Sequence, residues 1–138
     1  MLLTRIEPEA IPGLWPSIVN ILRPALEPDT TRTPDDLYEL LVMNRWAAWI
    51  AHGFNGVGIV VVELADDDEG RMCLFLRYVA GRAGIRVIRE GLALLEDAAR
   101  QAGCKMASIG GRKGWVRAFP DYTVKIDNGS YVELRKAL

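Results

Sequence analysis

The sequence predicts a single α+β domain, residues 1–138, built on a mixed and mostly antiparallel sheet of about six strands. Three observations predict it: segments with a helical hydrophobic period, extended apolar runs between them, and one long amphipathic helix that separates two of the strands. A strand, a helix and a further strand in succession need a crossover, so those two strands are expected to be parallel or splayed. One core in a chain of this length buries roughly 65 to 70% of the unfolded surface.

The N-terminal segment is expected to contain two helices. Six of the seven prolines fall within the first 34 residues, which indicates short, punctuated pieces. Apolar residues at helical spacing predict a helix from about Pro16 to Glu27, with Pro24 near its end or kinking it. Thr33 is a suitable N-cap and Pro34 a suitable first helical residue, so a second helix is predicted from Pro34 to about Asn44.

Three strands are expected next, in the runs RWAAWIAHG, VGIVVVELA and MCLFLRYVA. The third run is apolar at every position from Met72 to Leu76, which is typical of a central strand covered on both faces. The link DDDEG between the second and third runs is interpreted as a polar hairpin turn, because its aspartates lack the alternating spacing of a calcium loop.

The second half begins with the clearest helix, Ile85 to Ala102, whose apolar residues form one stripe and which Gly103 ends as a C-cap glycine. CKMASIG is predicted to be a fourth strand, and RKGWVRAF a short helix. The tail YTVKIDNGSYVELRK is predicted to be a β-hairpin, in which the Asn128-Gly129 pair suits a tight primed turn.

Charge is distributed unevenly although the net charge is only −1. Residues 1–70 contain 12 acidic and 4 basic residues, and residues 77–117 contain 9 basic and 3 acidic ones, which gives −8 and +6. The split indicates either an anion-binding middle or docking between complementary surfaces, and a solvated helix face would carry several of the same charges. A pI near 5.8 argues against a dedicated nucleic-acid binder.

Several classes of protein are not favoured by the sequence. No apolar run reaches the roughly 18 residues of a membrane span, and no signal peptide is indicated. Cys73 and Cys104 lie in apolar runs and are expected to be buried free thiols rather than a disulfide or metal pair. No metal site, nucleophile elbow or P-loop is indicated, and the lone His52 at a strand exit is not expected to have a chemical role.

The stretch YVAGRAGIR, residues 78–86, is the most informative corner of the chain. A pyrophosphate is held well by backbone N–H groups at a glycine-rich helix N-terminus, where four amides lack intrahelical partners. The alternative is that Gly81 and Gly84 only let the chain leave a strand and pack the following helix closely. Both interpretations remain open on the sequence alone.

The order of elements resembles the GNAT superfamily of N-acetyltransferases over nearly the whole chain. The residues that carry the resemblance are GLALLEDAARQAGCKMASIGGRKGWVRAFPDYTVK and YVELRK, and they are most similar to small bacteriophage-encoded members. The resemblance implies helices on both faces of the sheet and an acetyl-CoA site at the glycine corner. The family's corner pattern places Tyr78, Gly81 and Ala83 at its three defined positions, of which the first is usually polar.

The resemblance also implies site residues. Arg82, Gly84 and Arg86 would join Tyr78, Gly81 and Ala83 as cofactor-binding residues. Many members use a tyrosine of the short helix as the acid that protonates the departing thiolate, and Arg117 stands at that position here. Tyr122 is the candidate substitute, with a core or edge aromatic as the other interpretation. Glu63 is the candidate base, because a buried carboxylate in an apolar run should have a raised pKa, with a solvent-facing glutamate as its alternative.

Two hypotheses follow. In the first, the protein is a catalytically degenerate phage-type member that needs no cofactor and acts as a virion or assembly component, contacting other phage proteins or itself, in the host cytoplasm or incorporated in the virion. In the second, it is an acetyl-CoA-dependent N-acetyltransferase. The altered corner, the missing tyrosine and the charge split favour the first. Neither hypothesis involves a membrane or a metal ion.

Overall fold

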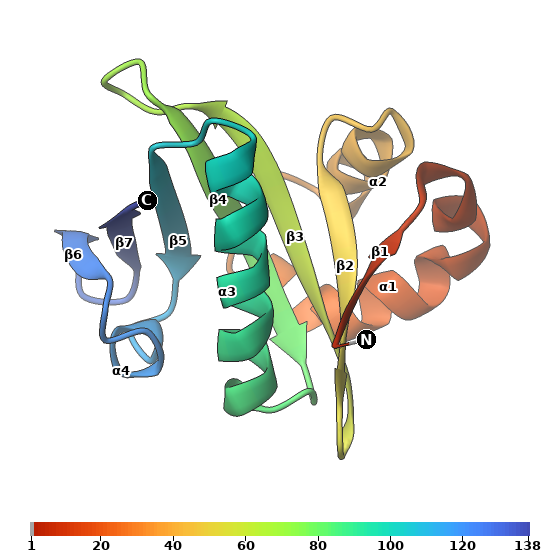
Figure 1. The fold of residues 1–138 in the computed structure, drawn as a ribbon. Helices are drawn as coiled ribbons and strands as arrows, with labels where there is room; N and C mark the ends of the chain where they lie inside the picture. Colours follow the sequence, from red (N-terminus) through yellow and green to blue (C-terminus); the bar gives the residue numbers. More distant parts are fainter. Residues whose placement is uncertain (1) are drawn as a thin grey trace.

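The structure is a computed structural model that describes residues 2–138, and in these residues seven strands form one sheet with helices on both faces (Figure 1). The strands are β1 (Leu3–Ile6), β2 (Ala47–Gly53), β3 (Gly56–Asp66), β4 (Met72–Gly81), β5 (Met106–Gly111), β6 (Thr123–Asp127) and β7 (Val132–Ala137). The helices are α1 (Ile11–Leu26), α2 (Pro34–Val42), α3 (Ile85–Gln101) and α4 (Trp115–Ala118), preceded by a 3-10 turn at Pro8–Ala10. Within this range no helix is both long and apolar enough to cross a bilayer.

The strand order is β1-β2-β3-β4-β5-β7-β6, so β4 lies at the centre as its apolar sequence predicts. All neighbours are antiparallel except β4 and β5, which are joined by α3 and run parallel. Their pairing spans only residues 73–76 of β4 and 106–109 of β5. Beyond that point the two strands diverge toward their carboxyl ends (Figure 1). The predicted crossover between splayed strands is therefore confirmed.

A bulge in β4 begins where the pairing with β5 stops. Val61 of β3 pairs with Tyr78, but the next residue, Val62, pairs with Leu76, so Arg77 is the extra residue. A bulge bends its strand and turns consecutive side chains toward the same face. Arg77 reaches Glu63, and Tyr78 joins the core under α1 and α2.

Two apolar cores flank the sheet. The larger lies under α3, whose buried residues are Ile88, Gly91, Leu92, Leu95, Glu96 and Ala99. The middle of the predicted stripe, Ile88 to Ala99, thus packs on the sheet, whereas Ile85 and Leu94, also predicted to belong to it, are exposed. The smaller core joins α1 and α2 to the opposite face of β2, β3 and β4. Cys73 and Cys104 are both buried and unbonded to each other, as expected.

Three features of the structure differ from the sequence-based predictions: the start of one helix, one additional strand and one turn. Helix α1 begins at Ile11 instead of Pro16, and Pro16 lies inside it, because burial of Ile11 and Ile18 outweighs the hydrogen bond that a proline removes. Strand β1 was not predicted, since its four residues adjoin the proline-rich segment. The predicted tight turn at Asn128-Gly129 is wrong: β6 and β7 are joined by residues 128–131, and only Gly129 has the positive φ that a primed turn needs at both central positions.

Glycines bring the β2–β3 hairpin into contact with the corner between β4 and α3. A Cβ at Gly81 would lie 2.5 Å from the Gly58 Cα and 2.6 Å from the Val57 carbonyl oxygen, and the φ of Gly81 is +119°. A Cβ at Gly53 would overlap the backbone of Ala83. The Arg82 amide donates to the Val57 carbonyl at 2.9 Å. The path of the chain into α3 therefore depends on side-chain-free positions on both segments.

Gly81→Ala is expected to destabilise the protein by about 2 kcal/mol, because the new methyl group meets backbone atoms and the residue has a left-handed φ. Urea unfolding followed by circular dichroism measures the change. Gly13→Ala in α1 is the matched control: a Cβ there has no neighbour within 4 Å, so the change should be neutral or stabilising by up to about 1 kcal/mol. Equal stability of the two variants would contradict the role given to the contact.

Candidate functional site

Helix α3 starts at the point where β4 and β5 have parted, and its N-terminus has no side-chain cap. Gly84 is the N-cap residue with φ of +87°, and its carbonyl accepts the first helical bond, from the Ile88 amide at 3.1 Å. The N–H groups of residues 85–87 lie in the first turn and have no acceptor within the helix. Together with the helix dipole they form a region of positive potential.

A groove of about 530 Å³ lies between this helix end and α4. Its lining contains three arginines and no carboxylate: Ile85, Arg89, Arg112, Gly114, Trp115, Arg117 and Ala118. The Arg89 Nε donates to the Ala118 carbonyl at 2.6 Å, which ties α3 to α4. The Arg112 guanidinium lies 5.3 Å from the centre of the Trp115 ring. The groove is therefore suited to an anion that also carries a flat apolar group.

The opposite face of the sheet carries a polar cluster at the β4 bulge. Arg77 donates two hydrogen bonds to the Glu63 carboxylate, and its guanidinium lies 4.3 Å from the centre of the Phe75 ring. The Tyr78 hydroxyl donates to the carboxylate of Asp29, which belongs to the connection between α1 and α2. The bulge thus holds that connection against the centre of the sheet.

Opposing effects set the pKa values of this Tyr78–Asp29 pair. Partial burial alone would raise the pKa of Asp29, but hydrogen bonds from Thr31 and Tyr78 outweigh it and the pKa lies below its usual value of 3.8. Burial, with the nearby carboxylate, raises the pKa of Tyr78 above 10.0. Around neutral pH, Asp29 is an anion and Tyr78 a neutral donor.

Tyr131, in the β6–β7 connection, brings its hydroxyl to the fork between β4 and β5. Gly110 directly follows Ile109, the last β5 residue paired with β4, and a Cβ at Gly110 would overlap the Tyr131 hydroxyl oxygen. Burial raises the pKa of Tyr131, and the Glu133 carboxylate adds to the increase. The residue as a whole is 44% exposed, and the raised pKa keeps the hydroxyl protonated at neutral pH.

Comparisons with known proteins place the fold. No protein-family model matches the chain, and no curated protein matches its sequence. An aminoglycoside 6'-acetyltransferase type Ii structure superposes with a TM-score of 0.70 at 13% identity, covering 99% of this chain and 97% of that one. A ribosomal-protein-alanine N-acetyltransferase from Brucella melitensis gives 0.67 at 16% identity over 100% of both chains. A GNAT-family acetyltransferase from Listeria monocytogenes gives 0.64 at 12%, covering 99% and 94%.

The fold is that of the GNAT acetyltransferases. The resemblance inferred from the sequence is confirmed at the level of the fold, over nearly the full chain, and nothing in the comparisons supports a phage origin. On this GNAT fold, the groove beside α3 and the polar cluster lie on opposite faces of the sheet, and the fork between β4 and β5 lies between them.

Five of the predicted cofactor-binding residues lie at the corner between β4 and α3. Gly81 and Ala83 contact the β2–β3 hairpin, and Gly84 caps α3. The Arg82 side chain adjoins Gly56 of that hairpin. The exposed Arg86 forms an ion pair with Glu90 one turn further along the helix, at 3.4 Å.

Three other predicted residues lie away from the groove. Tyr78 points to the face opposite α3, toward Asp29. Glu63 shares that face and is paired with Arg77. Tyr122 is buried in the core under α3, where its hydroxyl donates to Glu96 at 2.6 Å; burial and that carboxylate raise its pKa strongly.

Sequence reasoning did not select the groove residues Arg112 and Trp115, the anchoring residue Asp29 or the fork residue Tyr131. The spacing of Arg112 and Trp115 in the GRKGW turn, just before a short helix, was a usable signal. Tyr131 had none, because its position depends on how far the β6–β7 connection folds back over β5. Among residues 2–138 no cluster of three or more potential metal ligands occurs. The one side-chain hydrogen bond of His52 within that range joins its Nε2 to the Thr4 hydroxyl at 3.3 Å.

Tyr78→Phe is expected to lower the free energy of unfolding by about 2 kcal/mol at neutral pH, because a buried hydroxyl that donates to a carboxylate is lost. The pKa of Asp29 is lowered in the folded state, so its contribution falls as pH drops below about 4. The pKa of Tyr78 is raised, so its contribution falls as pH rises above about 10. The difference in the free energy of unfolding between wild type and variant should therefore become smaller at both low and high pH.

Urea unfolding of both proteins across this pH range measures the difference. Tyr38→Phe is the control, because the partly buried Tyr38 packs edge-on against Trp15 and has no carboxylate partner in the described part of the chain. A difference for Tyr78→Phe that stays constant with pH would contradict the assigned bond.

Proposed function

We propose that this protein is an acyl-CoA-dependent N-acyltransferase, with acetyl-CoA as the donor. One observation carries the proposal: the uncapped N-terminus of α3 opens on a groove that has three arginines and no carboxylate. This arrangement favours the interpretation that the glycine corner holds a pyrophosphate over the interpretation that it only lets the chain turn and pack. The fold of the solved acetyltransferases named above supports the same class of reaction.

The residues present fit coenzyme A. The amides of residues 85–87 would hold its pyrophosphate, since they are unsatisfied donors at a helix N-terminus. Arg112 and Arg117 would hold a further phosphate, and the Trp115 ring offers a surface for the adenine. When bound, the cofactor supplies an acyl group activated as a thioester.

The chain's own residues at the fork and on the opposite face would attract the acceptor amine and protonate the departing thiolate, and the proton lost by the attacking amine would pass to water. Asp29 is anionic at neutral pH and is suited to attract a protonated amine rather than to deprotonate it. The Glu63 carboxylate is already occupied by Arg77. The Tyr131 hydroxyl lies at the fork and keeps its proton at neutral pH. It would therefore donate the proton in place of the family's tyrosine, whose position Arg117 occupies in this chain.

A second function, the virion or assembly component, stays a prediction. The observation that favours it is the sheet edge: all five residues of β6 are exposed, including the apolar Val124 and Ile126. An exposed edge strand with apolar side chains is a surface to which another strand can add. Co-purification with assembled particles in stoichiometric amounts would support this function. Turnover of acetyl-CoA would contradict its main premise, which is that the protein has lost catalytic activity.

Acetyl-CoA is expected to bind the wild-type protein, and Arg112→Glu is expected to weaken binding at least about tenfold, because it places a carboxylate in the groove. Isothermal titration calorimetry at low salt measures both. Arg23→Glu, an exposed site on α1 away from the groove, is the control and should bind like wild type. No heat with the wild-type protein would overturn the proposal.

Tyr131→Phe and Tyr122→Phe are expected to have opposite effects. The first should reduce kcat at least about a hundredfold, since proton donation is lost, and leave stability within about 0.5 kcal/mol. The second should keep kcat and lose about 2 kcal/mol of stability, because Glu96 loses a buried partner. Thiol release from acetyl-CoA with a panel of amines gives kcat, and urea unfolding gives stability. The reverse pattern would assign the proton to Tyr122.

A further inference from the structure

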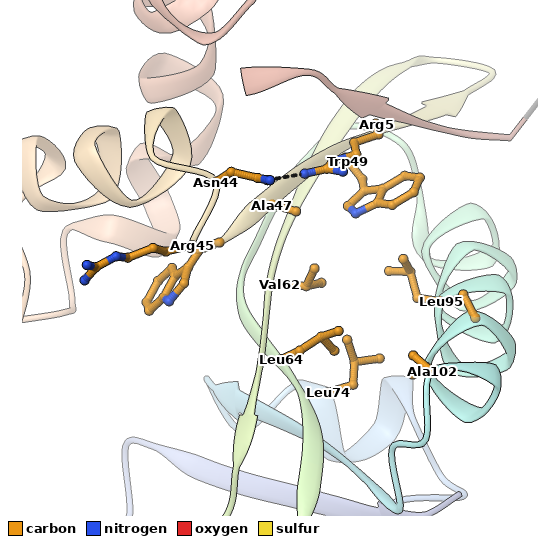
Figure 2. A pocket seen from close by; sticks show the side chains of 13 residues that line it. Arg5, Asn44, Arg45, Ala47, Trp49, Val62, Leu64, Leu74, Leu95 and Ala102 are labelled. Carbon is orange, nitrogen blue, oxygen red and sulfur yellow. Dashed lines mark hydrogen bonds between the residues drawn. The ribbon is translucent and has the colours of Figure 1, made fainter. Parts of the chain in front are cut away.

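A second cavity lies at the other end of α3, and nothing in the proposed acyl transfer uses it. It has a volume of about 370 Å³ and opens between the C-terminal half of α3 and strands β2 and β3 (Figure 2). The groove described above adjoins Ile85 and Arg89, whereas this cavity adjoins the α3 residues Leu95, Ala98, Ala99 and Ala102. The two hollows therefore lie at opposite ends of one helix.

The body of the cavity is apolar. Trp49, Val62, Leu64 and Leu74 line it from the sheet, and Leu95 lines it from α3 (Figure 2). Leu74 is buried to 2% exposure, so the cavity reaches the main core, whereas Leu64 is 50% exposed at its mouth. At about 30 Å³ per non-hydrogen atom, the space holds about a dozen such atoms of a ligand.

The rim of the cavity is cationic. Arg5 and Asn44 line it, and no aspartate or glutamate does. Arg45 also adjoins the rim, but its side chain points away from the cavity (Figure 2). Arg5 donates from Nη2 to the Asn44 side-chain oxygen, while its Nε is buried and has no acceptor within residues 2–138. In the same range neither arginine forms an ion pair with a carboxylate. Because the Nε is covered by protein atoms, a ligand would meet the Nη end of the guanidinium, where only one hydrogen bond, from Nη2 to Asn44, is already made. A guanidinium without a carboxylate partner attracts an anion.

We propose that this cavity binds a small monocarboxylate with an unbranched or ring-shaped apolar body. The carboxylate lies at the Arg5 guanidinium and supplies the negative charge that the protein does not. The apolar body lies between Trp49 of β2 and Leu95 of α3. A phosphate or sulfate ion does not match the apolar floor, and a neutral hydrocarbon leaves Arg5 without a counter-charge.

Octanoate is a suitable probe, because its carboxylate and apolar chain fit the volume, and Trp49 reports on binding by fluorescence. We expect a saturable change with a dissociation constant on the order of 1 mM, given its ligand size. Octan-1-ol, which has the same chain without the charge, should bind at least about fivefold more weakly, and inorganic phosphate should not compete. The measurement needs no acetyl-CoA, so its outcome is independent of the proposed function.

Variants test the two halves of the site. Arg5→Gln should weaken octanoate binding about tenfold and leave octan-1-ol binding unchanged, whereas Arg5→Lys, which keeps the charge, should lose less. Ala98→Phe fills the mouth from an exposed position of α3 and should abolish binding of both probes. Ala93→Phe is its matched control, an exposed alanine of the same helix outside the cavity, and should bind like wild type.

Three results would overturn the proposal. Equal affinity for octanoate and octan-1-ol would show that the cavity does not recognise a carboxylate. Equal binding by Ala98→Phe and Ala93→Phe would place the ligand elsewhere on the protein. A wild-type fluorescence signal that only drifts linearly with octanoate would show that no specific site exists. Thermal unfolding of each variant confirms that the comparison is made between folded proteins.

Discussion

The parallel pairing of β4 with β5 stops after four residues, and the candidate active site depends on that stop. Had the two strands stayed paired to their ends, Gly110 would lie in a continuous ladder and α3 would begin against a closed sheet. The bulge at Arg77 turns β4 away just beyond Leu76, so the backbone of the two strands separates. The groove and the polar cluster therefore lie on opposite faces of the sheet, on either side of the point where β4 and β5 separate.

Close contact between glycines fixes the direction in which α3 leaves this gap. The β2–β3 hairpin touches the backbone of residues 81–83, and the Arg82 amide is bound to Val57. Side chains at those positions would push the hairpin and the corner apart and would tilt the first turn of α3. The same glycines therefore allow the chain to turn and also aim the unsatisfied amides of the helix. The two interpretations of the glycine corner, a pyrophosphate site and a turn that allows close packing, therefore describe two consequences of the same contact.

Most of the fold could be predicted from the sequence, because local patterns determine it. The apolar stripe of α3, the N-cap at Thr33 and the apolar run of residues 72–76 in β4 are local signals, and the helices and the central strand that they predict are present in the structure. Strand β1 and the start of α1 could not be predicted, since prolines obscure the pattern and burial of Ile11 decides the outcome. The site was harder still. Tyr131 and Asp29 are close to the bulge only because two distant connections fold over the sheet, and no spacing in the sequence encodes that approach.

The Tyr131 hydroxyl occupies the space that a Cβ at Gly110 would need, which links the identities of two residues that are 21 positions apart in the chain. Any side chain at position 110 displaces the phenol ring, and any smaller residue at position 131 frees the space for one. Substitutions at these positions should therefore be strongly non-additive, with the second change costing little once the first has been made. Natural relatives are then expected to vary at both positions together or at neither.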